Sequence, residues 1–259
     1  MMARSRFIRS LITLAGLLLA WDLVVRLLDL PAYILPPPHR VTMTIVSRFD
    51  LLLSEAAVTV AEMLLGLIFG AWLGAAAALG LLLSPGARRW LLPIIIASQA
   101  IPVFALAPLL VLWFGYGLPS KVIMAMIIIF FPVTATLYDG LRRTEPGWLD
   151  LAHVMTGGDK RHRYRILLRI RLMAALPAFA SGLKVAAAVA PIGAVIGEWV
   201  GASAGLGFLM LQANARVQID LMFAALIVLA VCAVSLYAAV DALSRRLLPW
   251  QADTQALSN

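Results

Sequence analysis

The sequence has few charged residues. Of its 259 residues, 13% are charged and 63% are hydrophobic, whereas a soluble domain carries about 25% charged and about 45–50% apolar residues. A water-soluble single domain is therefore excluded, and so is disorder, whose signature is low hydrophobicity. The composition predicts a polytopic membrane protein. Because a spanning helix needs roughly 20 apolar residues, the chain has room for about six of them.

Residues that build reactive centres are also scarce. Cys232 is the single cysteine, so no intrachain disulfide can form. The three histidines, His39, His153 and His162, are dispersed along the chain and predict neither a metal site nor a nucleophile. The phosphate-binding loop Gly-x-x-x-x-Gly-Lys-Ser/Thr is missing, and its nearest match, Gly115–Lys121, has the wrong spacing. We therefore expect no enzyme, no cofactor and no ATP hydrolysis by this chain.

Long apolar runs predict an all-α fold with six transmembrane helices. Inside a bilayer the backbone must satisfy its own hydrogen bonds, which runs of this length do as helices. No apolar–polar alternation is present that would favour a barrel. The first run continues past Trp21 without a small-residue cleavage site, so we interpret it as a retained span and not a secretory signal. The predicted spans cover residues 10–30, 58–83, 90–112, 121–139, 182–202 and 220–241.

The basic residues predict the orientation. If the N-terminus is cytoplasmic, 16 of the 21 Lys and Arg residues fall on the inner side, and such an excess is typical of cytoplasmic loops. Both termini are therefore predicted to be cytoplasmic. The net charge of +8 has the same explanation, so we expect membrane lipid and not nucleic acid as a partner.

The predicted connections divide the chain into segments. An N-terminal span (1–30) is followed by an outer segment (31–57), a core domain (58–246) and a C-terminal tail (247–259). The outer segment opens with a Pro-rich stretch, after which 41–49 could form a short amphipathic helix at the membrane surface. Within the core domain, the cytoplasmic loop 140–181 is unusually long, and long loops usually serve a function or a partner.

Proline and glycine residues divide this inner loop into shorter elements. The turn Glu145-Pro146-Gly147 precedes a predicted short helix, Trp148–Met155. Gly157 and Gly158 would end that helix, and Asp159 is a suitable N-cap for a basic helix that runs into the next span. The basic charges alone could simply anchor the loop to anionic lipid headgroups. The glycine-bounded short helix favours docking onto a partner protein.

The loop resembles the cytoplasmic coupling loop of ATP-binding-cassette importer permeases. The family pattern is Glu-Ala-Ala, three residues, Gly, and a distal Ile-x-Leu-Pro. Ala152 and Gly157 match it, whereas Leu151 and His153 stand in place of Glu and Ala. Asp150 could replace the missing glutamate. The resemblance implies that Asp150, Ala152, His153, Gly157, Gly158 and Asp159 form the ATPase-coupling loop.

Further motifs resemble the nitrate, sulfonate and taurine permease family. They are Leu35–Pro38, Ala105–Leu109, Trp113–Gly115 and Gly205–Leu209. The resemblance implies an inner-membrane permease, present as a homodimer, with two cytoplasmic ATPase subunits that use the ATP. It also implies a periplasmic or lipid-anchored substrate-binding protein.

Two segments resemble a narrower branch of that family. Ala190–Gly201 and Gln212–Arg216 are similar to permeases associated with hydroxymethylpyrimidine-type precursors of thiamine. Import of such a pyrimidine is the implied function, with sulfonate, taurine or nitrate as the alternative substrates.

Polar residues within the predicted spans are candidates for the substrate path, because ionisable groups at membrane depth usually face a cavity or a partner. Glu198 and Trp199 are the first candidates, since an aminopyrimidine offers donors to a carboxylate and a ring face to an indole. Gln99 and Glu62 follow. Alternatively, Glu198 pairs inside the subunit. Asp22 is four residues from Arg26, so these two are predicted to pair structurally.

Glycine and proline leave two further alternatives. Gly66, Gly70 and Gly74 share one face of the second span, where small residues permit close helix packing. That packing could be internal or could form the homodimer. Pro93, Pro102 and Pro108 predict a bent third span, either beside the translocation path or as a structural kink.

Two rival classes fit less well. An ion-coupled secondary transporter is typically built from a repeat with polar groups near the midplane, and the long inner loop has no counterpart elsewhere in the chain. A membrane-embedded enzyme requires clustered His, Asp or Glu at one depth, which the sequence does not show.

Overall fold

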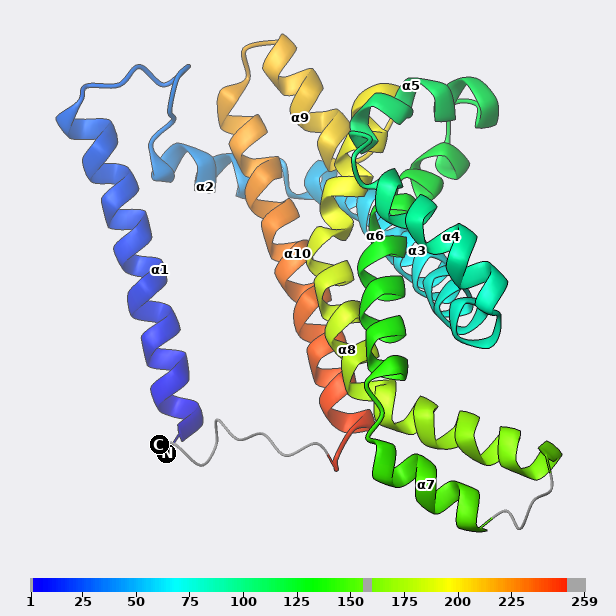
Figure 1. Ribbon diagram of the computed structural model, residues 1–259. Coiled ribbons are helices and arrows are strands. Elements are labelled where there is room, and N and C mark those ends of the chain that lie inside the picture. Colours follow the sequence, from blue (N-terminus) through cyan, green and yellow to red (C-terminus); the bar gives the residue numbers. More distant parts are fainter. Residues whose placement is uncertain (1, 156–159, 251–259) are drawn as a thin grey trace. The chain divides into compact units, whose positions relative to one another are not determined.

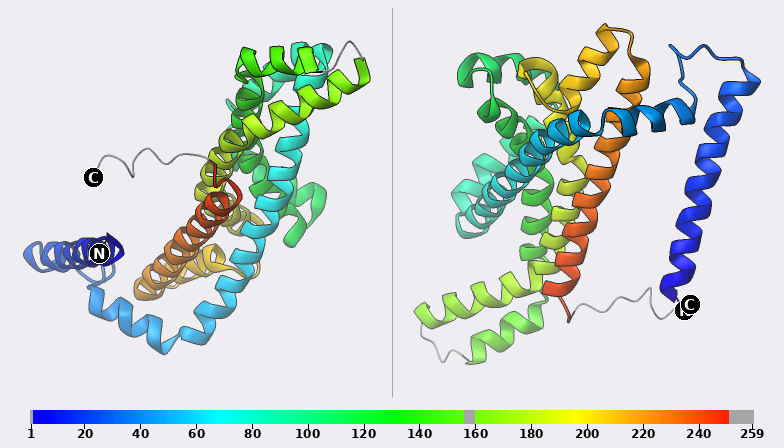
Figure 2. Two further views of the ribbon diagram at one scale, coloured as in Figure 1. Left: turned by 90° about the horizontal axis from the view of Figure 1, so that it is seen from below. Right: turned by 180° about the vertical axis from the view of Figure 1, so that it is seen from behind.

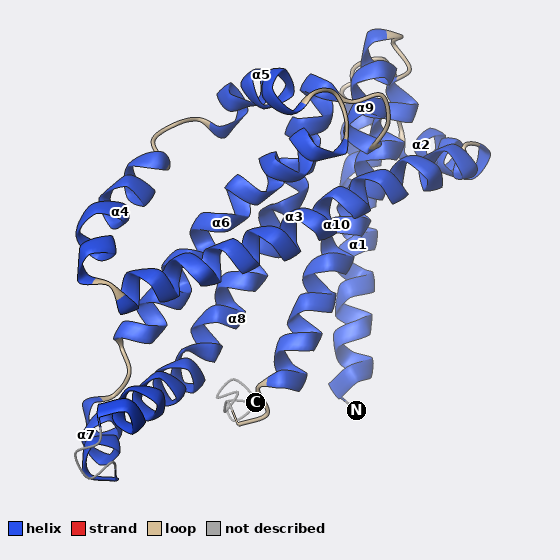
Figure 3. Ribbon diagram, turned by 90° about the vertical axis from the view of Figure 1, so that its right-hand side faces the viewer, coloured by secondary structure: helices blue, strands red, loops and turns tan. Residues whose placement is uncertain are grey.

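The computed structural model describes residues 2–155 and 160–250. Within these ranges every regular element is a helix, and Figure 3, coloured by secondary structure, contains no strand there. The all-α prediction is confirmed. The helices are α1 (Met2–Leu27), α2 (Pro38–Ser47), α3 (Phe49–Leu83), α4 (Pro85–Ser98), α5 (Val103–Phe114), α6 (Leu118–Arg142), α7 (Pro146–Met155), α8 (Lys160–Gly201), α9 (Leu206–Ala215) and α10 (Ile219–Leu247).

Four helical segments among the described residues are long and apolar enough to cross a membrane. They are Phe49–Leu83, Leu118–Arg142, Leu168–Gly201 and Ile219–Leu247, and the pair α4 and α5 makes a fifth if it counts as one span. These five correspond to the second to sixth predicted spans. The first predicted span falls on the 26-residue helix α1, so the total of six stays a prediction.

The third predicted span, 90–112, is bent as predicted, and the bend is a break between two helices. Helix α4 ends at Ser98, α5 begins at Val103, and the two helix axes differ by 102°. Both helices are labelled in Figure 1. Pro102 is the N-cap residue of α5, and a proline disfavours helical backbone at the residue before it. Pro93 and Pro108 lie inside α4 and α5 without ending them. Of the three prolines, Pro102 therefore marks the break.

The outer segment is more helical than predicted. A short helix is present where one was predicted over 41–49. It is α2, which ends at Ser47 and begins at Pro38, because proline already has the backbone angle of a first helical residue. Helix α3 begins at Phe49, well before the predicted start of the second span at 58. Polar residues such as Asp50 and Glu55 lower the hydropathy over the first turns of α3, so hydropathy did not predict this start.

The chain divides into two compact units. Unit 1 comprises residues 1–59 and 203–231, and unit 2 comprises 60–202 and 232–259. In unit 2, α6 and α8 pack along each other, as Figures 1 and 2 show. Alanines on α8 keep the two helices close. The central core consists of Met63, Leu67, Ala125, Ile129, Val133, Ala186, Ala187, Ala190, Ala194 and Val240.

The glycine stripe of α3 faces α6. A Cβ added at Gly66 would overlap Ala125, and one at Gly70 would lie 2.7 Å from the Cγ2 of Ile129. One at Gly74 would lie 3.0 Å from the carbonyl oxygen of Phe130. The internal packing alternative is therefore correct. A homodimer contact through this stripe is excluded because α6 already covers it.

In unit 1, α3 caps the start of α9. The backbone N–H of Gly205 donates to Glu55 Oε2 at 2.5 Å, and that of Leu206 donates to Thr59 Oγ1 at 2.8 Å. The first amides of a helix have no partner within it, so these side chains satisfy two of them. Within α1 the predicted pair is present, with Asp22 and Arg26 2.7 Å apart.

We predict that Gly66→Leu destabilises the protein and that Gly80→Leu does not. A larger side chain at Gly66 must displace the α6 backbone at Ala125, and such overpacking costs about 1–3 kcal/mol. Nothing lies within 4 Å of a Cβ added at Gly80, on the same helix. Thermal unfolding of both variants in detergent measures the difference. Equal melting temperatures would contradict the packing described here.

Candidate functional site

The inner loop forms a helical hairpin. Helix α6 ends at Arg142, α7 follows from Pro146 to Met155, and α8 begins at Lys160. The predicted short helix is therefore confirmed and begins two residues earlier. The predicted basic helix is the first part of α8, which continues through Pro177 and Pro191 to Gly201 without interruption. Both views in Figure 2 show α7 beside the first part of α8.

The coupling-loop residues are only partly described. Gly157, Gly158 and Asp159 lie outside the described residues, and Ala152 and His153 lie in α7 with side chains that are not described. Asp150 is exposed on α7, as an external docking role requires.

The turn into α7 is held by local hydrogen bonds. Trp148 Nε1 donates to Glu145 Oε2 at 3.0 Å, three residues earlier. The hydroxyl of the buried Thr144 donates to the carbonyl oxygen of Leu141 at 3.3 Å. The first bond lies in the opening turn of α7 and the second closes the end of α6, so each orders one side of the three-residue connection 143–145.

One face of α7 is apolar and exposed. Leu151 is 59% exposed and Val154 is 80% exposed, and residues three apart lie on the same helix face. Large apolar side chains grouped on an exposed helix are typical of an interaction surface.

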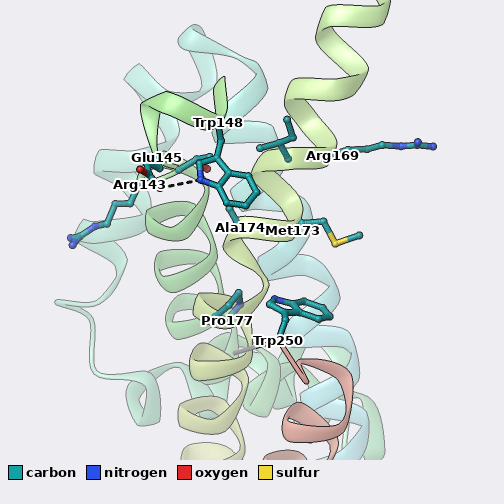
Figure 4. Close-up of a pocket in the computed structure, with 10 residues that line it drawn as sticks. Arg143, Glu145, Trp148, Arg169, Met173, Ala174, Pro177 and Trp250 are labelled. Carbon is teal, nitrogen blue, oxygen red and sulfur yellow. Dashed lines mark hydrogen bonds between the residues drawn. The ribbon is translucent and has the colours of Figure 1, made fainter. Parts of the chain in front are cut away.

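A cavity of about 780 Å³ lies beside α7. Figure 4 shows Trp148 and Trp250 at its two sides and the α8 residues Met173, Ala174 and Pro177 along it. Its lining is predominantly apolar. The lining residues are Arg143, Thr144, Glu145, Trp148, Arg169, Ile170, Met173, Ala174, Pro177 and Trp250.

A second candidate site is a buried group of charges in unit 2. Lys121 Nζ of α6 lies 2.8 Å from Glu62 Oε1 of α3, and their side chains are 6% and 0% exposed. Glu198 of α8 is 1% exposed and interacts with Glu62. Burying such charges is costly unless they are paired. The cluster therefore stabilises the contact of the three helices while all partners are present, and loss of one partner would leave a buried charge uncompensated.

Lys121 is a member of this cluster that sequence reasoning missed. It is buried and forms an ion pair. Gly197 makes room for it, since a Cβ there would lie 3.1 Å from the Cα of Lys121. The position of Lys121 at the first residue of a predicted span was the available signal. Glu62 lies too far away in sequence for its partner to be identified.

Two of the four substrate-path candidates are buried and two are exposed. Glu62 and Glu198 lie together and are buried in this conformation. Trp199, next to Glu198, is 51% exposed, and Gln99 is exposed at the break between α4 and α5, 3.4 Å from the Ser98 hydroxyl. Sequence reasoning also missed an ion pair across unit 2, in which Lys184 Nζ lies 2.6 Å from Asp241 Oδ1.

Over the residues that the structure describes, no group of three or more His, Cys, Asp or Glu side chains could hold a metal ion.

The chain matches the family described as binding-protein-dependent transport system inner membrane component over residues 66–249. It is 51% identical to a probable ABC transporter permease protein of Haemophilus influenzae, over 94% of this chain and 98% of the relative. It is 35% identical to the formylaminopyrimidine transport permease ThiX of Halalkalibacterium halodurans (91% and 92%). It is also 35% identical to the riboflavin transport system permease RibX of Chloroflexus aurantiacus (93% and 89%).

Permeases named for taurine and for aliphatic sulfonates match as well, at 26–30% identity. The chain therefore belongs to the family of binding-protein-dependent ABC importer permeases, and the resemblance found in the sequence is confirmed. It is a multi-pass inner-membrane component and not an enzyme. Membership implies an ATPase and a substrate-binding protein as partners.

We predict that Lys121→Met destabilises the protein strongly, by about 3–5 kcal/mol, because it leaves buried carboxylates without their cation. The double variant Glu62→Gln/Lys121→Met is expected to lose less than the single variant, since one carboxylate is removed with the lysine. Arg26→Met, which breaks a pair whose arginine is 74% exposed, should change stability by less than about 1 kcal/mol. Thermal unfolding in detergent compares the three variants, and a double variant less stable than Lys121→Met would argue against the ion pair.

Proposed function

We propose that this permease imports a hydroxymethylpyrimidine-type precursor of thiamine. Two observations support the substrate: the resemblance of Ala190–Gly201 and Gln212–Arg216 to that branch, and the 35% identity to a relative named for formylaminopyrimidine transport. An equally similar relative is named for riboflavin, so riboflavin is the second candidate. Sulfonate, taurine and nitrate remain the alternatives from the wider family.

The residues proposed to meet the substrate are Trp199, Glu198, Gln99 and Glu62. The exposed indole of Trp199 can stack on a pyrimidine ring. Glu198 can accept hydrogen bonds from an amino group, but it is 1% exposed here. It would therefore contact substrate only in a conformation in which α8 has moved relative to α3 and α6.

We further propose that α7 is the coupling helix. Its exposed Leu151 and Val154 would insert into a groove of a cytoplasmic ATPase subunit, and the short connection 143–145 would pass the motion to α6. Closure of the ATPase pair on binding ATP would then move the spans as rigid bodies from an inward-open to an outward-open state. Two copies of the chain and two ATPase subunits would form the complex, with both termini of each chain in the cytoplasm.

The substrate is tested by uptake into vesicles that contain the reconstituted complex and its binding protein. Labelled hydroxymethylpyrimidine is expected to accumulate in an ATP-dependent way, whereas riboflavin, taurine and nitrate are not. Uptake of one of these three without the pyrimidine would replace the proposed substrate. Omitting ATP is the control for leakage.

Coupling is tested with Val154→Glu. A carboxylate on the apolar face of α7 would be desolvated in the ATPase groove, so we expect ATPase binding and ATP-driven uptake to fall at least about tenfold, which corresponds to about 1.4 kcal/mol. Val46→Glu on α2 is the matched control, because Val46 is 78% exposed and lies outside the loop. If Val154→Glu binds the ATPase like the unmodified chain, α7 is not the docking element.

A further inference from the structure

The connection between α4 and α5 leaves backbone groups without hydrogen-bond partners. Helix α4 ends at Ser98 and α5 begins at Val103. Among the described residues, no group donates a hydrogen bond to the carbonyl oxygens of Gln99, Ala100 or Ile101. The amide of Val103 finds no acceptor there either, as is usual for the first amide of a helix without a side-chain cap. The break therefore presents a stretch of free polar backbone.

Packing on α6 places this break halfway along a spanning helix. On one side of the break, Ile95 of α4 packs against the cluster that contains Leu137 of α6. On the other side, Val103 of α5 packs against the cluster that contains Met124 of α6. Met124 and Leu137 lie about 20 Å apart along α6, on either side of the middle of Leu118–Arg142, which is long and apolar enough to cross a membrane. The break therefore lies within the spanning region, away from both ends of α6.

The residues around the break agree with this depth. No charged residue occurs between Arg89 and Lys121, and the break falls within that run. Ser98 and Gln99 are polar and exposed. Gln99 Nε2 donates to Ser98 Oγ at 3.4 Å, and Ser98 Oγ donates to the carbonyl oxygen of Ile95 at 2.7 Å. Neither bond satisfies a carbonyl group of residues 99–101.

Free carbonyl groups at this depth need water or protein. Hydrocarbon offers no hydrogen bonds, so irregular backbone within a membrane is tolerated only where it is buried in protein or lines a water-filled cavity. Residues 98–102 are all exposed, so this chain does not bury them. A permease also requires a water-filled path along its spans, and secondary transporters place broken helices at their binding sites. Contact with water therefore accounts for the exposed polar break.

We propose that the break between α4 and α5 forms part of the wall of the water-filled substrate path. Of the two explanations for the bent third span, a position beside the path is thereby preferred to a structural kink. Water molecules donate to the carbonyl oxygens of Gln99, Ala100 and Ile101, and the N–H or O–H groups of a passing solute replace them. Such a wall favours solutes that carry donors, as an aminopyrimidine does, over nitrate, which has none.

This inference deepens the proposed role of Gln99 and rests on that part of the proposed function. It adds the backbone beside Gln99 as the group that contacts the solute. It depends neither on α7 nor on which donor-bearing solute is imported. The chain allows a direct test, because Cys232 is its only cysteine and Cys232→Ala gives a background without thiols.

The test is cysteine labelling in the Cys232→Ala background. The complex with its ATPase subunits is placed in nanodiscs, without ATP or solute, and treated with a charged methanethiosulfonate reagent that reaches both membrane faces. Gln99→Cys and Ala100→Cys are expected to react. Val234→Cys is the matched control, because Val234 is 67% exposed in the middle of the apolar helix α10. The thiolate is the reactive form and hydrocarbon disfavours it, so the control should react at least about tenfold more slowly.

Labelling after denaturation in sodium dodecyl sulfate checks that every introduced thiol is intact, and size-exclusion chromatography checks that each complex is assembled. If Gln99→Cys and Ala100→Cys react as slowly as Val234→Cys, then lipid or a second copy of the chain covers the break, and the proposal is wrong. Because this arm uses no solute, its outcome is independent of the uptake assay.

A second arm tests the contact with the solute. Whichever of hydroxymethylpyrimidine, riboflavin, taurine and nitrate the vesicles accumulate is added at saturating concentration before the reagent. It should slow the labelling of Ala100→Cys several-fold and leave that of Val234→Cys unchanged. Equal labelling of Ala100→Cys with and without the imported solute would overturn the contact.

Discussion

The close approach of three helices at Ala125 is the constraint on which the rest of unit 2 depends. Gly66 of α3 and Gly193 of α8 both pack against Ala125 of α6, and a Cβ added at Gly193 would lie 2.6 Å from the Ala125 Cα. Lipid provides no hydrophobic driving force between spanning helices. Their association depends instead on the van der Waals contacts that closely packed small residues permit. One helical turn away, the same approach brings Lys121 and Glu198 to Glu62.

This close packing explains how the buried charges can be tolerated. Charges at membrane depth are costly unless each has a partner, and the cluster supplies partners only in the packed arrangement. A rigid-body motion of α8 against α3 and α6 would have to break or carry the cluster as a unit. The same helices extend to the inner loop, where the three-residue connection 143–145 joins α6 to α7. The packed pair of α6 and α8 therefore also supports the helical hairpin of the inner loop.

The inner end of this pair carries an exposed apolar helix face. Leu151 and Val154 are exposed on α7 and suit a protein groove. Helix α7 has ten residues and is too short to be stable alone. Its contact with α8 therefore decides where α7 lies.

The sequence by itself determined the all-α fold, the apolar spans and the short helix of the inner loop, because these follow from hydropathy, glycine and proline, which act locally. The pairing of Asp22 with Arg26 was predictable for the same reason. Only the tertiary structure decided that Lys121 is buried against Glu62, that the glycine stripe faces α6, and that the third span breaks by 102°. These features depend on which helices meet, and residues far apart in the chain carry no local signal of their contact.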